Sequence, residues 1–323
     1  HESLRTRFVV KDGGPVQQID ATAKLPLHML PLPGATQAQI TQELTQLTQH
    51  HFALDRGPLI SFSLLRLGDA DNVLHIVMHH IIGDAWSTDV LLRELTALYS
   101  EAAGGESANL PALPVQFADY AAWQAERLAE PDMQDMLAYW KDKLTGAPAV
   151  LDLPTDRPRP AVQTFNGAWH ELRLSKDLTA AIHKLAGEQN ATLYRVLLAA
   201  FDLLLNRYSG QTDIGVGSPV AGRQQSELEH LIGFFINTLA MRADLDADPT
   251  FRALIEQVKT TALEAYARQE LPFEQLVEEL QPVRDTSYAP VFQVMFILQN
   301  APVTAMPWEG LDSEQMLFCL LYT

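Results

Sequence analysis

Short β-type runs alternate with amphipathic helices along this chain, and this alternation limits the possible folds more than any other feature. Residues 59–67 and 73–80 are β-rich runs separated by the turn composition Gly-Asp-Ala-Asp-Asn, so we expect a hairpin. Apolar residues at helical spacing predict helices near 87–103, 115–128 and 132–144, and Ser87 is expected to cap the first. The sequence therefore predicts an α/β protein with layered elements.

A proline-rich stretch at 153–161 divides the chain. It holds three prolines and three charged residues and predicts an extended connector. We therefore expect a first domain at 1–155, a connector at 156–161 and a second domain at 162–323. In the second domain we expect strands near 169–174, 213–220, 237–244 and 291–299, and helices near 175–189, 192–208, 251–268 and 272–280.

Charge and cysteine content exclude several classes of protein. The chain has 23 Lys plus Arg against 40 Asp plus Glu, a net charge of −17, which argues against nucleic-acid or anionic-membrane partners. Cys319 is the single cysteine, so no intramolecular disulfide can form and a cytoplasmic location is expected. No leader segment and no run of 18 apolar residues occurs. The first residues lack an initiator Met and the last, MLFCLLYT, lack a helix stop, so we expect both ends to be cuts in a longer polypeptide.

The densest group of reactive side chains is the stretch HHIIGDAWS at residues 79–87, between an apolar strand and a helix. A histidine can move a proton near neutral pH, and Asp84 can restrain the loop or pair with a cation. A satisfied core histidine and a turn-holding aspartate would explain the same residues without catalysis. His79 and His80 are neighbours on a strand and point to opposite faces, so we expect no metal site. No Gly-x-Ser-x-Gly elbow, phosphate-binding loop or GxGxxG motif accompanies them.

Six segments in the right order make the chain resemble condensation domains of non-ribosomal peptide synthetases. HHIIGDAWS resembles the HHxxxDG signature of that family. The remaining five resemble its other motifs: HESLRTRF at 1–8, QFADYAAWQ at 116–124, IGFFINTLAMR at 232–242, RQELPFEQL at 268–276 and VRDTSYAPVFQVMF at 283–296.

The resemblance implies a fold and an activity. The fold would be of the chloramphenicol-acetyltransferase type, an α+β sandwich in two lobes with the active-site tunnel between them. The activity would be amide formation, in which a donor acyl thioester on one carrier protein passes to the α-amine of an aminoacyl group on a second carrier. The domain itself would bind no cofactor, because the partner carriers supply the 4'-phosphopantetheine arms. A neighbouring adenylation domain is a further expected partner.

The resemblance also assigns roles within the HHxxxDG stretch. His80, supported by His79, would stand at the reacting centre as general base or as a positioner of the amine. Asp84 would hold the loop through a salt bridge to an arginine. One candidate is the leading Arg of the family's first motif, which is missing from HESLRTRF, and this leaves Arg5 as the nearest cation of that motif. Ala85 replaces the family's Gly; it costs on the order of 1 kcal/mol if the backbone there has positive φ, and nothing if it begins an ordinary helix.

The remaining candidate residues have supporting or substrate-side roles. Gly83 and Trp86 are expected to support the loop, through backbone geometry and core packing respectively. Asn237 would line the tunnel or cap a strand. Trp123 packs a helix or contacts substrate, and Arg284 and Ser287 form a polar latch or a solvated turn.

The motif details favour a domain that accepts an L-configured donor. Three alternatives stay open: an epimerisation-type domain, a coenzyme A-dependent acyltransferase of the same superfamily, and a catalytically inactive piece that docks carriers or acts as a scaffold.

Overall fold

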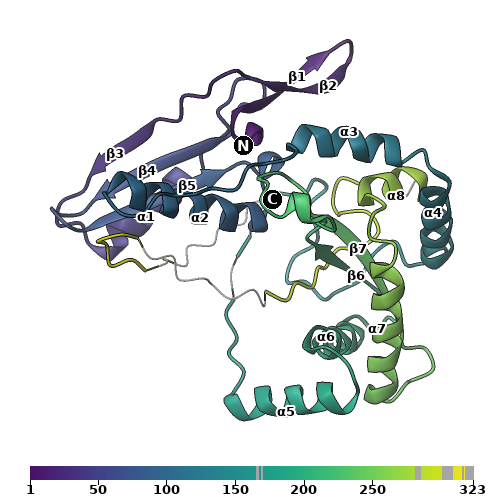
Figure 1. The fold of residues 1–323 in the computed structure, drawn as a ribbon. Coiled ribbons are helices and arrows are strands. Elements are labelled where there is room, and N and C mark those ends of the chain that lie inside the picture. Colours follow the sequence, from purple (N-terminus) through teal and green to yellow (C-terminus); the bar gives the residue numbers. More distant parts are fainter. Residues whose placement is uncertain (165–166, 169, 281–284, 300–307, 315, 317–323) are drawn as a thin grey trace. The chain divides into compact units, whose positions relative to one another are not determined.

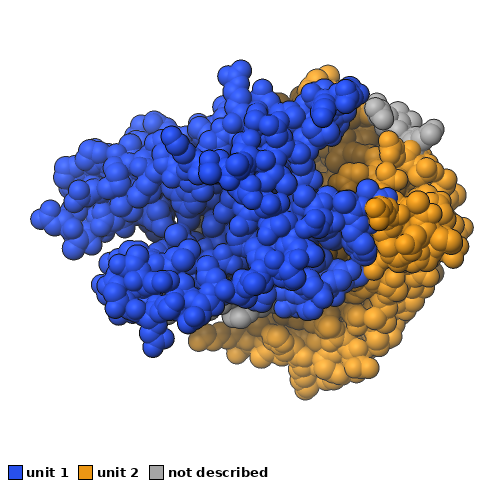
Figure 2. Space-filling model, turned by 45° about the horizontal axis from the view of Figure 1, so that its top comes forward, with its two compact units in different colours: residues 1–125, 223–235, 303–320 blue, residues 126–222, 236–302, 321–323 orange. Residues whose placement is uncertain are grey.

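The computed structural model describes residues 1–164, 167–168, 170–280, 285–299, 308–314 and 316 (Figure 1). Backbone proximity divides the chain into two compact units, coloured separately in Figure 2. Unit 1 comprises residues 1–125, 223–235 and the described part of 303–320, and unit 2 comprises the described residues of 126–222 and 236–302. The sheets and helices together confirm the expected mixed α/β class.

Unit 1 is built on a three-stranded sheet in the order β3-β4-β5. The strands β4 (Ile60–Arg66) and β5 (Asn72–Met78) form the predicted antiparallel hairpin, and β3 (Leu27–Pro31) runs parallel to β4. Helix α1 (Gln37–Thr48) packs its buried Ile40 and Leu44 against Leu65. Helix α2 (Ala85–Ala102) packs against a second apolar cluster, which contains Ile60 and Ile232.

A separate hairpin and two short helices complete the first part of unit 1. The strands β1 (Thr6–Lys11) and β2 (Gly14–Ile19) pair antiparallel around Asp12 and Gly13, both of which have positive φ. The 3-10 helix η1 (Glu2–Arg5) precedes β1, and η2 (His80–Ile82) follows β5. Helix α3 (Phe117–Arg127) begins in unit 1, where Phe117 and Tyr120 pack against buried Phe235.

Unit 2 combines an antiparallel pair of strands with five helices among its described residues. The strands β6 (Asp213–Val220) and β7 (Asn237–Asp244) pair over their full length. The helices are α4 (Pro131–Leu144), α5 (Lys176–Glu188), α6 (Leu193–Ser209), α7 (Phe251–Tyr266) and α8 (Phe273–Leu280). Their apolar faces join both strands in one core that includes Val196, Ile214 and Ile255. Helix α6 ends at Gly210, whose φ of 71° is the left-handed conformation that glycine adopts without strain.

Two expected strands of the second half differ in the structure. The expectation of a strand at 169–174 is wrong for its described residues 170–174, which are exposed and do not pair with another strand; Trp169 lies outside the described residues. An alternating pattern cannot form a strand unless another backbone edge is available. The run 291–299 is reduced to one parallel bridge, in which the Gly217 N–H donates to Val294 O at 2.9 Å and the Phe296 N–H to Gly217 O at 2.9 Å.

The short 3-10 helix η3 (Ser226–Leu228) lies in the segment 223–235, which belongs to unit 1 although both of its sequence neighbours belong to unit 2. The predicted connector at 156–161 lies within unit 2. The expected division at that connector remains a prediction. Among the described helices, none has the length and apolar character that crossing a membrane requires.

Candidate active site

The HHxxxD stretch forms a tight passage from strand β5 to helix α2. The His79 N–H donates to Leu59 O at 2.8 Å, which keeps the end of β5 beside the start of β4. His80 then begins η2, whose single turn is closed by the Gly83 N–H donating to His80 O at 3.3 Å. Gly83 is extended and Asp84 precedes the first residue of α2. The passage from strand to helix therefore takes six residues, and the two histidines are the first of them.

Asp84, rather than Ser87, caps helix α2. Its Oδ1 accepts the Ser87 N–H at 2.8 Å and the Ser87 hydroxyl at 2.7 Å, so the expected cap at Ser87 is wrong by three residues. An N-cap side chain accepts from the third residue of the helix, and Ser87 is that third residue. The Asp84 side chain is buried, and its Oδ2 accepts the Phe235 N–H at 3.0 Å.

The cationic partner of Asp84 is Arg223, not Arg5. A terminal nitrogen of Arg223 lies 3.1 Å from Asp84 Oδ1, and their side chains are 0% and 4% exposed. Arg5 instead pairs with Glu2 at 2.9 Å and donates to the Asp20 carbonyl, so the expectation for Arg5 is wrong. Arg5 thus contacts Glu2 of its own 3-10 helix and Asp20, which follows strand β2, rather than Asp84.

Both terminal nitrogens of Arg223 are held by groups of unit 1, whereas its buried Nε has no hydrogen-bond partner among the described residues. Arg223 donates to the carbonyls of Leu228 and Leu231 and, at 2.9 Å, to the Ser87 hydroxyl. Its guanidinium carbon lies 4.0 Å from the centre of the Phe235 ring. Burial lowers the pKa of Arg223, and the charge of Asp84 opposes that shift. An arginine keeps its charge in proteins, so the pair is a buried ion pair with several hydrogen bonds.

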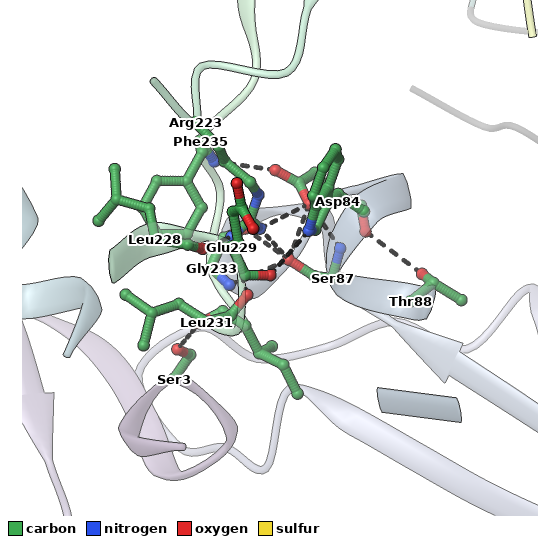
Figure 3. A network of polar contacts seen from close by, with 12 residues as sticks. Ser3, Asp84, Ser87, Thr88, Arg223, Leu228, Glu229, Leu231, Gly233 and Phe235 are labelled. Atoms are coloured by element: carbon green, nitrogen blue, oxygen red, sulfur yellow. Dashed lines mark hydrogen bonds and ion pairs between the residues drawn. The ribbon is translucent and has the colours of Figure 1, made fainter. Parts of the chain in front are cut away.

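The segment 223–235 is fixed to the start of α2 by further hydrogen bonds (Figure 3). The Gly233 N–H donates to the Ser87 hydroxyl oxygen at 3.1 Å, and the Gly233 carbonyl oxygen lies 2.8 Å from that hydroxyl oxygen. The Trp86 indole N–H donates to the Glu229 carbonyl at 2.8 Å. From the other side, Ser3 of η1 donates to the Ile232 carbonyl. The loop and this segment therefore form one connected polar network.

The two histidines of the motif have different environments. His79 is half-buried, and its Nδ1 accepts the Ile81 N–H at 3.1 Å. Burial, with a smaller contribution from neighbouring His80, lowers the pKa of His79, so its ring is neutral at pH 7 with the proton on Nε2. The His80 side chain is exposed and lies against Phe234, with ring centres 5.2 Å apart. His79 thus organises the turn, whereas the His80 ring is exposed.

The space around residue 83 requires glycine, and the ordinary helix geometry at residue 85 allows alanine. Gly83 has φ of −172°, which any residue adopts, but a Cβ there would lie 2.8 Å from Met78 Sδ. Gly83 therefore makes room for a packed side chain. Ala85 is the exposed first residue of α2 and is not among the residues with positive φ. Its methyl group consequently causes no backbone strain.

The two candidate tryptophans, Trp86 and Trp123, are more exposed than core residues. Trp86 is 43% exposed, so the expected core packing is wrong, and its indole is fixed by the hydrogen bond to Glu229. Trp123 is 40% exposed on α3, with its ring centre 5.7 Å from that of Tyr120. The ring centre of Tyr120 in turn lies 4.8 Å from that of Phe235. Trp123 is therefore linked to Arg223 through aromatic packing.

The substrate-side candidates of the second half belong to unit 2 or lie outside the described residues. The Asn237 amide donates to Gln269 O at 2.8 Å and to Leu271 O at 2.7 Å, and its oxygen accepts the Phe273 N–H at 3.0 Å. Asn237 therefore joins the start of β7 to the start of α8. Ser287 closes a turn in which its N–H donates to Asp285 Oδ1 at 2.7 Å. Arg284 lies outside the described residues.

Sequence reasoning missed Arg223 and Phe234. Arg223 follows Gly222 directly after strand β6, in a polar stretch that carries no recognisable pattern. Phe234 lies inside the quoted segment IGFFINTLAMR, where a glycine followed by two phenylalanines was the only available signal. In the part of the chain that the structure describes, no three His, Cys, Asp or Glu side chains gather as a metal-binding group.

Comparison with known proteins gives the family. The condensation-domain family model matches residues 1–318. A protein of the linear gramicidin synthase from Brevibacillus parabrevis is 50% identical over 309 residues, which are 94% of this chain and 4% of that protein. Phosphinothricin tripeptide synthetase PhsC of Streptomyces viridochromogenes is 43% identical over 304 residues, 93% of this chain and 28% of that protein. The chain thus spans a small part of these relatives.

Solved structures agree with the sequence comparison. A four-domain nonribosomal peptide synthetase bound to AMP and glycine matches with a TM-score of 0.86 and 30% identity, over 94% of this chain and 23% of that one. The X-domain from teicoplanin biosynthesis matches with a TM-score of 0.84 and 31% identity, over 91% of this chain and 66% of that one. With the family model covering nearly every residue, the chain belongs to the condensation domains of non-ribosomal peptide synthetases.

Proposed function

We propose that this chain forms one amide bond in non-ribosomal peptide synthesis, with His80 at the reacting centre. The observation that carries the proposal is the buried network of Asp84, Ser87 and Arg223, which fixes the loop while the His80 ring stays exposed. A buried ion pair is costly to desolvate, so its presence beside an exposed histidine supports a role in holding that side chain in place.

The chemistry is aminolysis of a thioester. The acceptor's α-amine nitrogen attacks the donor carbonyl carbon, the C–N bond forms and the C–S bond breaks. The nitrogen loses one proton and the departing sulfur gains one, so no oxidant or further reactant is needed. His80 carries that proton or orients the amine by a hydrogen bond, and proton transfer of this kind contributes roughly 10²–10⁴-fold to a rate.

The partners that this reaction requires are a donor carrier and an acceptor carrier, each bearing a 4'-phosphopantetheine arm as part of the substrate. An adjoining adenylation domain would load the acceptor, and the cytoplasm would be the site of synthesis. We also propose an L-configured donor, the chloramphenicol-acetyltransferase-type pair of lobes and a tunnel between them. The similarity to peptide synthetases over 93–94% of the chain supports these proposals.

Supporting roles follow from the contacts of each residue. His79 shapes the turn through Ile81, Gly83 leaves room for Met78, and Trp86 ties the loop to the segment 223–235. Asn237 orders the chain before α8. We propose that Asn237, Trp123, Arg284 and Ser287 support the substrate side of the site without taking part in bond formation or proton transfer.

A second candidate function is a scaffold that binds a partner without catalysis. It is favoured by the similarity to the teicoplanin X-domain, which has been solved in a complex with OxyB. The epimerisation-type and coenzyme A-dependent alternatives share the histidine loop and differ in their products.

The test is intact-mass detection of dipeptidyl thioester on the acceptor carrier, using the full-length protein and both carriers preloaded. The wild type is expected to give product, His80→Ala to give none above background, and the exposed control His28→Ala to match the wild type. Binding of both carriers without product would refute condensation and support the scaffold. Inversion of the loaded residue, or transfer from coenzyme A, would identify the other two enzymes.

A further inference from the structure

Phe234 is an exposed aromatic residue beside the exposed histidine. It is 36% exposed, whereas the next residue, Phe235, is 3% exposed. The ring centres of Phe234 and His80 are 5.2 Å apart and their planes meet at 82°, an edge-to-face geometry within the favourable range for aromatic pairs. Core packing does not require a phenyl ring at position 234, because the ring of Phe235 already fills the core against Arg223.

The backbone on both sides of Phe234 is held by the start of α2. The Gly233 N–H donates to the Ser87 hydroxyl oxygen, and the Phe235 N–H donates to Asp84 Oδ2. Asp84 also caps the helix that follows the histidine loop, by accepting the Ser87 N–H. The position of the Phe234 ring relative to His80 is therefore fixed by the same residues that fix the loop.

Glycine at 233 makes this close approach possible. A Cβ there would lie 2.8 Å from Phe235 Cε2 and would also overlap the Phe117 ring. The segment can thus pass near α3 while the two phenylalanines after it take different directions, one into the core and one toward His80.

Restricting the His80 ring has a direct consequence for reactivity. His80 has an exposed side chain, and its ring makes no hydrogen bond with the described residues, so packing against Phe234 is what limits its rotation. A ring held at one angle presents its nitrogen to the reacting amine without an ordering cost at each turnover.

We propose that Phe234 is a positioning residue that fixes the plane of the His80 imidazole by edge-to-face contact. This inference rests on the proposed function, in which His80 meets the reacting amine. It concerns the aromatic ring specifically, not apolar volume.

The experiment compares Phe234→Ala, Phe234→Leu and Phe234→Tyr in the full-length protein with preloaded carriers. Loss of an aromatic contact is expected to lower kcat for peptide formation by about two- to tenfold in the Ala and Leu variants, with KM for the acceptor carrier unchanged. Phe234→Tyr, which keeps the ring, is expected to retain wild-type kcat. Tyr208→Ala is the control, because Tyr208 is an exposed aromatic residue of unit 2 at 65% exposure.

A wild-type kcat in Phe234→Leu would overturn the proposal, because it would show that apolar volume suffices. An unchanged kcat in Phe234→Ala would also overturn it. A raised KM with unchanged kcat would overturn it in favour of direct substrate contact. If the wild type forms no amide, the proposed function fails, and labelling by diethyl pyrocarbonate still tests the contact. Faster labelling of His80 in Phe234→Ala than in the wild type supports the contact, and equal labelling refutes it.

Discussion

The ion pair between Asp84 and Arg223 allows a quantitative prediction about the loop. With side-chain exposures of 4% and 0%, neither charge can be solvated by water after its partner is removed. Breaking a buried pair costs about 3–5 kcal/mol in the free energy of unfolding. We therefore expect Asp84→Asn and Arg223→Met each to lower that free energy by about 3 kcal/mol or more. The Asn oxygen can still accept the Ser87 N–H, so the helix cap survives and the lost charge dominates.

The double variant isolates the interaction. Once both charges are gone, no uncompensated charge is buried. The loss of unfolding free energy in the double variant should therefore be smaller than the sum of the two single losses by about 1–3 kcal/mol. Urea unfolding of the four proteins gives this coupling energy. Arg252 and Glu188 provide a matched control, because their nitrogen and oxygen are also 3.1 Å apart but their side chains are 59% and 44% exposed. That pair should couple by less than about 1 kcal/mol. Equal coupling for the two pairs would refute the argument from burial.

Three further substitutions test other parts of the structure. Asp202 is 2% exposed, and burial raises its pKa to about 8, so its contribution to stability is full below pH 4 and is lost as the pH rises toward 8. Asp202→Asn should therefore raise the free energy of unfolding by roughly 2–4 kcal/mol more at pH 7 than at pH 4. A difference between variant and wild type that does not change with pH would contradict this. Asn237→Ala should cost about 2–3 kcal/mol in urea unfolding because the carbonyl of Leu271 and the N–H of Phe273 lose their partner, and a loss under 1 kcal/mol would show that water replaces the amide. Gly233→Ala should lower the melting temperature through overpacking worth about 1–3 kcal/mol, and an unchanged melting temperature would show that the neighbouring rings can move aside.

Local sequence patterns predicted most elements of the fold. The helices of unit 2 carry long apolar stripes with Ser175, Thr192 and Thr250 as N-caps, so propensity, pattern and capping agree. The hairpin of β4 and β5 has a turn composition between two apolar runs. Such signals lie within a few residues of the structure that they specify, and they need no knowledge of the rest of the chain.

The hairpin of β1 and β2 and helix α1 were missed although signals for them exist. Asp12 and Gly13 are a hairpin-turn pair, but the strands beside them are mostly half-buried or exposed and lack a strong apolar face. Helix α1 has a capping box formed by Thr36 and Gln39, while its polar, glutamine-rich sequence weakens the apolar period. In both cases the turn or cap was a better indicator than hydrophobicity.

The partner of Asp84 could not be predicted from local pattern. Asp84 and Arg223 are 139 residues apart, and their meeting depends on the segment 223–235 packing into unit 1. A motif locates reactive residues on the chain, but long-range packing decides which cation reaches a buried carboxylate. The same reason applies to Phe234, whose importance follows from its contact with His80.

The most direct test of the account is the single-turnover rate of dipeptidyl thioester formation in the full-length protein, compared between the wild type and His80→Ala. We expect amide product on the acceptor carrier from the wild type and a rate lower by roughly 10²–10⁴-fold in the variant, with both carriers still bound. Product from both proteins at the same rate would contradict a role for His80, and carrier binding without product from the wild type would contradict condensation itself.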